Sequence, residues 1–146
     1  MRVFGVSERL GFGSAIRTWQ DVRRLHAMGF THVINLRSSR HYRNKLRSFH
    51  RLWLPFPDDK KPRPASFYRD ALRFYKRAMT CPNSKVYVMC HHGICRSASM
   101  TYFLLRASGF DYQRAESVVL EVRPRAIIRI AYRMCGEEYL ARTHKT

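Results

Sequence analysis

One stretch of the sequence combines residue types that could break a phosphate ester. Residues 90–97, which read CHHGICRS, place a thiol (Cys90), a guanidinium group (Arg96) and a hydroxyl (Ser97) close together. A cysteine thiolate is a strong nucleophile, and the planar fork of an arginine can hold two phosphate oxygens at once. The pattern predicts nucleophilic attack on a bound phosphate. The residues expected to surround that phosphate are His91, His92, Gly93, Ile94 and Cys95.

The residues on either side of this stretch, which we call the cysteine loop, predict a strand before it and a helix after it. Residues 85–89 are apolar and favour β structure, whereas residues 98–107 are helix-like. A strand that turns tightly into a helix aims the unpaired N–H groups of the helix at the turn, which then binds oxyanions. These N–H groups and Arg96 favour the thiolate of Cys90. Gly93 suits a backbone that must approach the ligand closely or adopt a positive φ.

The rest of the chain predicts an α/β fold. We expect strands at 2–6, 31–36, 52–56 and 86–89, and helices at 15–28, 66–79, 97–107, 111–122 and 126–141, with a short helix inside 37–51. Gly11, Gly13 and Ser14 are expected to form a loop that caps the first helix. Such alternation implies a central, mostly parallel twisted sheet of four to five strands flanked by helices, here as one domain over residues 1–146. Ligands bind at the carboxyl ends of strands in such sheets, and the cysteine loop lies at one.

The cysteine loop resembles the signature of the cysteine-dependent protein-tyrosine and dual-specificity phosphatases, which is a cysteine, five residues, an arginine and a serine. The resemblance covers roughly residues 52–140. It implies hydrolysis of phosphate monoesters of the phosphotyrosine or dual-specificity type through a cysteinyl-phosphate, with no metal and no cofactor. Cys90 would be the nucleophile, Arg96 would bind the phosphate, and Ser97 would donate to the sulfur as it leaves. The chain departs from the family at Met89, where most members have histidine.

The same resemblance implies a general-acid aspartate on an upstream loop. The Pro-Asp pair that contains Asp58 is similar to the acid loop of tyrosine phosphatases, and Asp58 precedes Cys90 by an interval typical of dual-specificity phosphatases. Asp58 is therefore the expected acid, and Asp59 is the alternative. Both could instead be turn residues that balance neighbouring lysines. The basic residues beside them suit multiply phosphorylated ligands such as inositol phosphates or phosphoinositides, so a phosphatase of the same superfamily that acts on these compounds is an alternative. The candidate substrate-binding residues are Lys60, Lys61 and Arg63.

Two further resemblances concern details of the loop. Residues 94–97 resemble the low-molecular-weight tyrosine phosphatases, whose loop carries a second cysteine at the offset of Cys95. We therefore predict a reversible Cys90–Cys95 disulfide under mild peroxide, with Cys95 as a small packing residue the alternative. Residues 90–93 and 123–124 resemble the RNA 5′-triphosphatase branch of the superfamily. That branch usually has asparagine and threonine where this chain has Cys95 and Ser97, and it often does without the acid that Asp58 would supply.

A zinc site in the loop is the other chemistry that its residues could support. Its potential ligands are Cys90, His91, His92 and Cys95. Adjacent ligands in one tight turn rarely close a tetrahedron, and no second cysteine–histidine pair is positioned to complete a known spacing. We therefore expect no metal.

The composition of the chain indicates which kinds of molecule it could bind. The net charge of +18 favours polyanions, although general solubility would explain it equally well. We expect a monomer that acts on a phosphorylated protein or another polyanionic phosphate substrate, with nucleic acid as a less favoured partner. Four irregularly spaced cysteines, no signal-like segment and no apolar run long enough to span a bilayer predict a cytoplasmic protein. An alternative of another class is a non-catalytic phosphate- or nucleic-acid-binding module in which Cys90 is idle.

Overall fold

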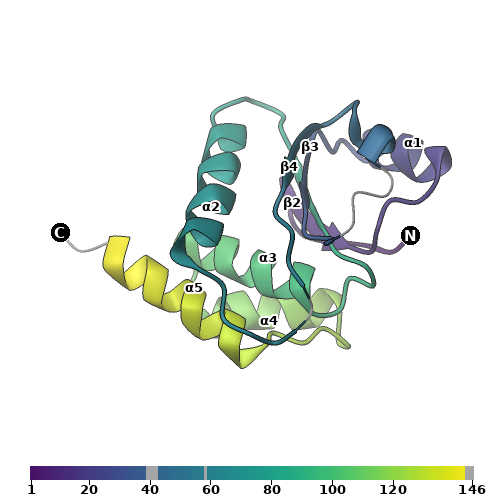
Figure 1. Cartoon of the computed structure of the whole chain (residues 1–146). Helices are drawn as coiled ribbons and strands as arrows, with labels where there is room; N and C mark the ends of the chain where they lie inside the picture. The colour runs from purple at the N-terminus through teal and green to yellow at the C-terminus, as the bar shows by residue number, and fades with distance from the viewer. Residues whose placement is uncertain (39–42, 58, 144–146) are drawn as a thin grey trace.

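A five-stranded sheet forms the centre of the molecule, with α1 on one side and the other four α-helices on the opposite side (Figure 1). The computed structural model describes residues 1–38, 43–57 and 59–143. The strands are β1 (Val3–Ser7), β2 (Leu10–Gly13), β3 (His32–Asn35), β4 (His50–Trp53) and β5 (Val86–Met89). The helices are α1 (Trp19–Ala27), the 3-10 helix η1 (Arg43–Leu46), α2 (Ala65–Met79), α3 (Arg96–Ala107), α4 (Tyr112–Val122) and α5 (Ile130–Thr143).

The strand order is β1-β2-β5-β3-β4, which confirms the expected α/β class. β1 pairs antiparallel with β2, and the other three pairs are parallel. Because β5 lies in the middle, its residues are hydrogen-bonded on both edges. The loop that follows β5 therefore starts from the most constrained point of the sheet.

The segment 10–13 is a strand, which corrects the loop expected there. Glycines usually weaken strands, and two of them made this segment look like a turn. Here they permit close approach, since a Cβ on Gly13 would lie 2.0 Å from the carbonyl oxygen of Arg2. The helix consequently begins later than expected. It is capped by Thr18, not Ser14, through a capping box in which Thr18 and Asp21 bond to each other's backbone N–H groups.

Other boundaries differ from the expectation by a few residues. β4 begins at His50, and α5 begins at Ile130 because 126–129 form an irregular connection beside the cysteine loop. Asp111 caps α4 as expected, accepting a hydrogen bond from the N–H of Arg114 at 2.8 Å. Gly29 ends the first helical segment with a φ of 91°, which glycine adopts without strain.

Alternation along the strands builds two hydrophobic cores. Val86 and Val88 belong to the larger core, with α2, α3, α4 and α5. Tyr87 and Met89 belong to the smaller core, with α1. Burial on both faces accounts for the continuous apolar run of β5. Within the described residues, no helix is long and apolar enough to cross a bilayer.

Candidate active site

The cysteine loop joins β5 to α3, as the sequence predicts. Cys90 directly follows β5 and is 2% exposed. Its N–H donates to the carbonyl oxygen of Gly13 at 3.3 Å, and the N–H of Ala15 donates to the carbonyl oxygen of His91 at 3.2 Å. The end of β2 and the residues after it therefore fix the start of the loop.

The loop curls so that its own groups face the Cys90 sulfur. The N–H of Gly93 donates to Sγ at 3.3 Å, and the Oγ of Ser97 lies 3.2 Å from Sγ in hydrogen-bond contact. Gly93 has a φ of 69°, and a Cβ there would lie 2.6 Å from the carbonyl carbon of Gly13. Glycine is thus required both by the backbone conformation and by the space. The Cys90 sulfur therefore lies inside the curl of the loop, within hydrogen-bond reach of one backbone N–H group and one hydroxyl.

Arg96 is the first residue of α3 and lies near the carboxyl ends of β3 and β4. Its Nη1 donates to the carbonyl oxygen of Phe56 at 2.8 Å and to that of Leu36 at 3.4 Å. These bonds use one of the three guanidinium nitrogens and fix the direction of the fork. The structure therefore brings together Cys90, Arg96 and Ser97, the three residues singled out in the sequence.

Two arginines after α4 support the loop, and no pattern in the sequence assigns them to it. The Nε of Arg123 donates to the carbonyl oxygen of Gly93 at 3.1 Å, and this side chain is only 6% exposed. The Nε of Arg129 donates to the Cys95 sulfur at 3.1 Å. The N–H of Ile127 donates to the carbonyl oxygen of Ile94 at 2.8 Å. The pair 123–124 was noted only for its likeness to an RNA-directed branch, and a contact across thirty residues is not readable from one sequence.

The residues on either side of Cys90 differ in environment. Met89 is fully buried in the smaller core, and its carbonyl oxygen accepts the N–H of Leu36 at 2.9 Å. At this position, where most family members have histidine, the structure shows a packing side chain. His91 is half-buried, and its ring lies 3.3 Å from a guanidinium nitrogen of Arg17. Burial lowers the pKa of His91, and neighbouring His92 and arginines lower it further.

Residues 59–63, which we call the acid segment because they adjoin the expected general acid, follow β4 in the chain. Asp58, the expected acid, lies outside the described residues. The alternative, Asp59, accepts hydrogen bonds from the N–H of Lys61 and from Arg63, both at 2.9 Å. The Lys61 N–H, followed by the charge of Arg63, holds the pKa of Asp59 below its ordinary value. A carboxyl held in its ionised form is a poor proton donor at neutral pH, so Asp59 is the weaker candidate.

The candidate substrate-binding residues differ in how they are engaged. The N–H of Lys60 donates to the hydroxyl of Tyr132 at 2.9 Å, and the side chains of Lys60 and Lys61 are exposed. Arg63 folds back on Asp59, and its guanidinium lies 5.4 Å from the centre of the Phe56 ring. Arg63 is thus held by its own segment.

Neither Cys90 nor Cys95 forms a disulfide in the structure, and their pairing under peroxide stays a prediction. Among residues 1–38, 43–57 and 59–143, no three His, Cys, Asp or Glu side chains gather as a metal site requires.

Comparison with known proteins agrees with this geometry. Residues 13–135 match the family described as the catalytic domain of dual specificity phosphatases. The structure of PTPMT1 is similar with a TM-score of 0.82 and 18% identity, covering 99% of this chain and 100% of that one. Human DUSP28 is similar with a TM-score of 0.83 and 20% identity, covering 98% and 95%. PTPMT1 in complex with PI(5)P gives a TM-score of 0.77 at 17% identity, covering 97% and 98%.

No curated protein sequence gives a significant match. The structural likenesses, at such low identity, establish the fold, whereas the family match extends over most of the chain. A strand, a loop that surrounds a cysteine sulfur and a helix that begins with arginine are together the arrangement expected of that family. The chain therefore belongs to the dual specificity phosphatase family.

Proposed function

We propose that this phosphatase domain hydrolyses phosphate monoesters with Cys90 as nucleophile. The observation that carries the proposal is the setting of the Cys90 sulfur, which accepts a hydrogen bond from the Gly93 N–H and lies in hydrogen-bond contact with the Ser97 hydroxyl. A buried cysteine that only fills space needs no such contacts. A nucleophilic sulfur at the carboxyl end of a central strand does, because both groups can donate to it once it is a thiolate.

In the first step the Cys90 thiolate attacks phosphorus, and the bond between phosphorus and the leaving oxygen breaks. Asp58 gives its proton to that oxygen, so the alcohol or phenol leaves neutral. Arg96 and the loop N–H groups hold the equatorial oxygens, on which negative charge accumulates. The product of this step is a cysteinyl-phosphate on Cys90.

In the second step water attacks the cysteinyl-phosphate, and the Asp58 carboxylate accepts the proton from this water. The bond between sulfur and phosphorus breaks, and inorganic phosphate leaves. The Ser97 hydroxyl donates a hydrogen bond to the departing thiolate, which lowers the cost of its negative charge. The leading substrates are phosphotyrosine, phosphoserine or phosphothreonine in proteins, and inositol phosphates or phosphoinositides are the alternative.

The test is hydrolysis of phenyl phosphate without added metal. We expect Cys90→Ser to lower kcat by about a thousandfold or more, because the nucleophile is removed. Cys81→Ser is the matched control, since Cys81 is an exposed cysteine away from the loop. Asp58→Asn should lower kcat by about a hundredfold or more. Loss in Asp59→Asn with retention in Asp58→Asn would move the acid by one residue.

Two results would overturn the proposal. One is undiminished turnover by Cys90→Ser, and the other is no turnover by the wild type with any of three probes: phenyl phosphate, a phosphotyrosine peptide and triphosphate-ended RNA. Saturable phosphate binding without turnover would indicate a binding module instead. Turnover of the RNA alone would assign the chain to the RNA-directed alternative.

A further inference from the structure

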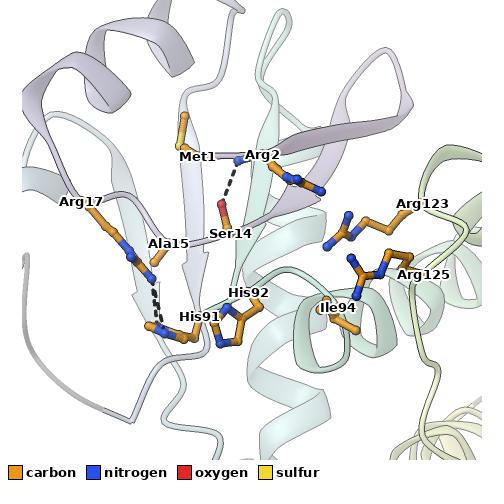
Figure 2. Close-up of a pocket in the computed structure, with 10 residues that line it drawn as sticks. All are labelled: Met1, Arg2, Ser14, Ala15, Arg17, His91, His92, Ile94, Arg123 and Arg125. Carbon is orange, nitrogen blue, oxygen red and sulfur yellow. Dashed lines mark hydrogen bonds between the residues drawn. The ribbon is translucent and has the colours of Figure 1, made fainter.

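A pocket of about 310 Å³ lies beside the cysteine loop, on the side of the amino terminus (Figure 2). Its floor includes Ser14 and Ala15, which follow β2. Three side chains of the cysteine loop line it as well. The backbone of the loop thus contacts the Cys90 sulfur, while these side chains extend into the pocket. The charged or titratable residues of the lining are Arg2, Arg17, His91, His92, Arg123 and Arg125.

Four arginines from three separate segments meet in this pocket, which we call the arginine pocket. Figure 2 shows Arg2, Arg123 and Arg125 directed toward one another, with Arg17 at the other end beside His91. No carboxylate of the described residues forms an ion pair with any of the four. The positive charge here is therefore not neutralised by the part of the chain that the structure describes.

Gathering these cations is unfavourable in the free protein. Burial lowers the pKa of Arg123, and the charges of Arg2 and Arg125 lower it further. Repulsion of this kind is relieved when an anion binds between the cations. A surface selected only for solubility would spread its charges apart instead.

Two of the guanidinium groups are held in place. Arg123 donates to Gly93 and lies with its guanidinium carbon 4.7 Å from the centre of the Phe4 ring. Arg17 contacts His91. Both contacts are made to the cysteine loop or to the sheet, so part of the order needed for binding exists before the ligand arrives. Arg2 and Arg125 are exposed, and Figure 2 shows both of them beside Arg123.

Guanidinium groups bind phosphate best, since their paired donors match two phosphate oxygens. The arginine pocket adjoins the loop that would hold the phosphate being cleaved, so one small molecule can reach both sites if its two phosphates are close. Phosphates on adjacent carbons of a polyol ring meet this condition. Phosphates on two residues of a peptide are separated by both side chains and the backbone between them.

We propose that the arginine pocket binds a second phosphate of the same substrate molecule, and that this substrate is a polyol ring with phosphates on adjacent carbons, such as an inositol bisphosphate headgroup. This assignment rests on the proposed function, because the first phosphate occupies the cysteine loop. Arg2 and Arg125 close on the second phosphate, while Arg123 lies beneath it and also supports Gly93.

The test compares an inositol bisphosphate, with its phosphates on adjacent carbons, against the inositol monophosphate that lacks one of them. The double variant Arg2→Gln/Arg125→Gln should lower the ratio of the two kcat/KM values by about tenfold or more, because two charge-assisted contacts to one phosphate are lost. The matched control is Arg73→Gln/Arg77→Gln, which removes the same charge from exposed positions on α2. Its ratio should stay within about twofold of the wild type, since distant surface charges are screened.

Equal losses in the two double variants would overturn the proposal, because general attraction would then explain them. An unchanged ratio in Arg2→Gln/Arg125→Gln would also overturn it. A loss seen only with a peptide that carries phosphothreonine and phosphotyrosine would overturn the assignment to a polyol. A loss of similar size with the soluble headgroup and with the same headgroup in phosphatidylcholine vesicles supports direct recognition, whereas a loss on vesicles alone contradicts it.

Failure of the proposed function can be told apart from failure of the pocket. Binding of the inositol bisphosphate to Cys90→Ser, measured by calorimetry, requires no turnover. In one outcome the wild type hydrolyses none of the substrates, while binding of the inositol bisphosphate to Cys90→Ser weakens about tenfold when Arg2→Gln/Arg125→Gln is added. That result would support the arginine pocket as a phosphate site and contradict the proposed reaction. If the wild type hydrolyses phenyl phosphate and the binding does not depend on Arg2 and Arg125, the proposed reaction is supported and the proposed role of the arginine pocket is contradicted.

Discussion

The two basic regions beside the cysteine loop differ in how their positive charge is balanced. The acid segment, residues 59–63, holds its arginine against its own aspartate, at 2.9 Å. The arginine pocket holds four arginines and no ion pair among the described residues. The positive charge that is available to a ligand is therefore decided by where the few carboxylates lie. The count of basic residues does not reveal it.

The two regions also differ in how they reach the loop. The acid segment is connected through Phe56, whose carbonyl oxygen accepts from Arg96 and whose ring contacts Arg63. The arginine pocket is connected through Arg123, which bonds to the carbonyl oxygen of Gly93. One region is connected to Arg96, and the other supports the backbone that faces the sulfur.

Among the changes that test this comparison, the largest effect is expected from breaking the loop that separates the two regions. In Gly93→Ala a Cβ would lie 2.6 Å from the carbonyl carbon of Gly13, at a φ of 69°. We expect the loop to shift and kcat/KM to fall by about a hundredfold or more for every substrate, because the reacting groups are misplaced. The strain should also cost about 1–3 kcal/mol of unfolding free energy.

Kinetics on phenyl phosphate and inositol bisphosphate, with urea unfolding, check this prediction. Gly5→Ala is the control, since Gly5 has nothing within 4 Å of the added Cβ. A loss confined to the bisphosphate would show that Gly93 serves the arginine pocket alone. The acid segment and the arginine pocket would then not both depend on the backbone position of the cysteine loop.

The sequence was sufficient for the fold class and for the residues at the sulfur. The run 90–97 follows an apolar strand directly, and local patterns of this kind indicate where Cys90 and Arg96 lie in the fold, while their chemistry stays a prediction. β2 was missed because its glycines, which normally indicate a turn, are needed here for close packing on β1. Burial against distant strands overrides local preference in such a segment.

The arginine pocket could not be predicted from the sequence for a different reason. Arg2, Arg17 and Arg125 are far apart in the chain, and in an arginine-rich sequence none stands out. Only the fold shows that β1, the residues after β2 and the connection after α4 converge at the loop. The choice between Asp58 and Asp59 is partly readable from structure, since Asp59 is bonded to Arg63.

A smaller effect would make the two regions more alike. In Asp59→Asn the ion pair to Arg63 loses its negative charge, so Arg63 becomes available to an anionic ligand. We expect the KM for inositol bisphosphate to fall about two- to threefold, the size usual for an exposed charge pair. Asp70→Asn is the control, because it removes the same charge from an exposed ion pair with Arg69 on α2.

The same kinetic measurement can contradict the difference that we describe between the acid segment and the arginine pocket. A KM that is unchanged in Asp59→Asn but lowered in Asp70→Asn would show that Arg63 is not restrained by its pairing. A collapse of kcat in Asp59→Asn would show that this carboxyl donates the proton, despite its lowered pKa.

An effect of similar size separates the two regions by their response to pH. Burial, then His92, Arg37, Arg17 and Arg96, hold the pKa of His91 below its ordinary value of 6.5. A phosphate bound in the arginine pocket cancels part of the arginine repulsion, so the pKa of His91 should rise on binding. A group whose pKa rises on binding takes up a proton, and it strengthens binding as the pH falls through the range between its free and bound values. The acid segment should give no such response, because the pKa of Asp59 is lowered and its carboxyl stays ionised throughout.

Calorimetry of inositol bisphosphate binding to Cys90→Ser and to Cys90→Ser/His91→Gln, between about pH 8 and about pH 5.5, checks this difference. The ratio of their affinities should rise by roughly threefold toward low pH in favour of the protein that keeps His91. Taking the ratio removes the titration of the ligand's own phosphates, which is common to both proteins and acts in the opposite direction. Proton uptake, measured in two buffers of different ionisation enthalpy, should appear only with His91 present. A flat ratio would place the second phosphate away from His91, and therefore away from the end of the pocket that Arg17 lines.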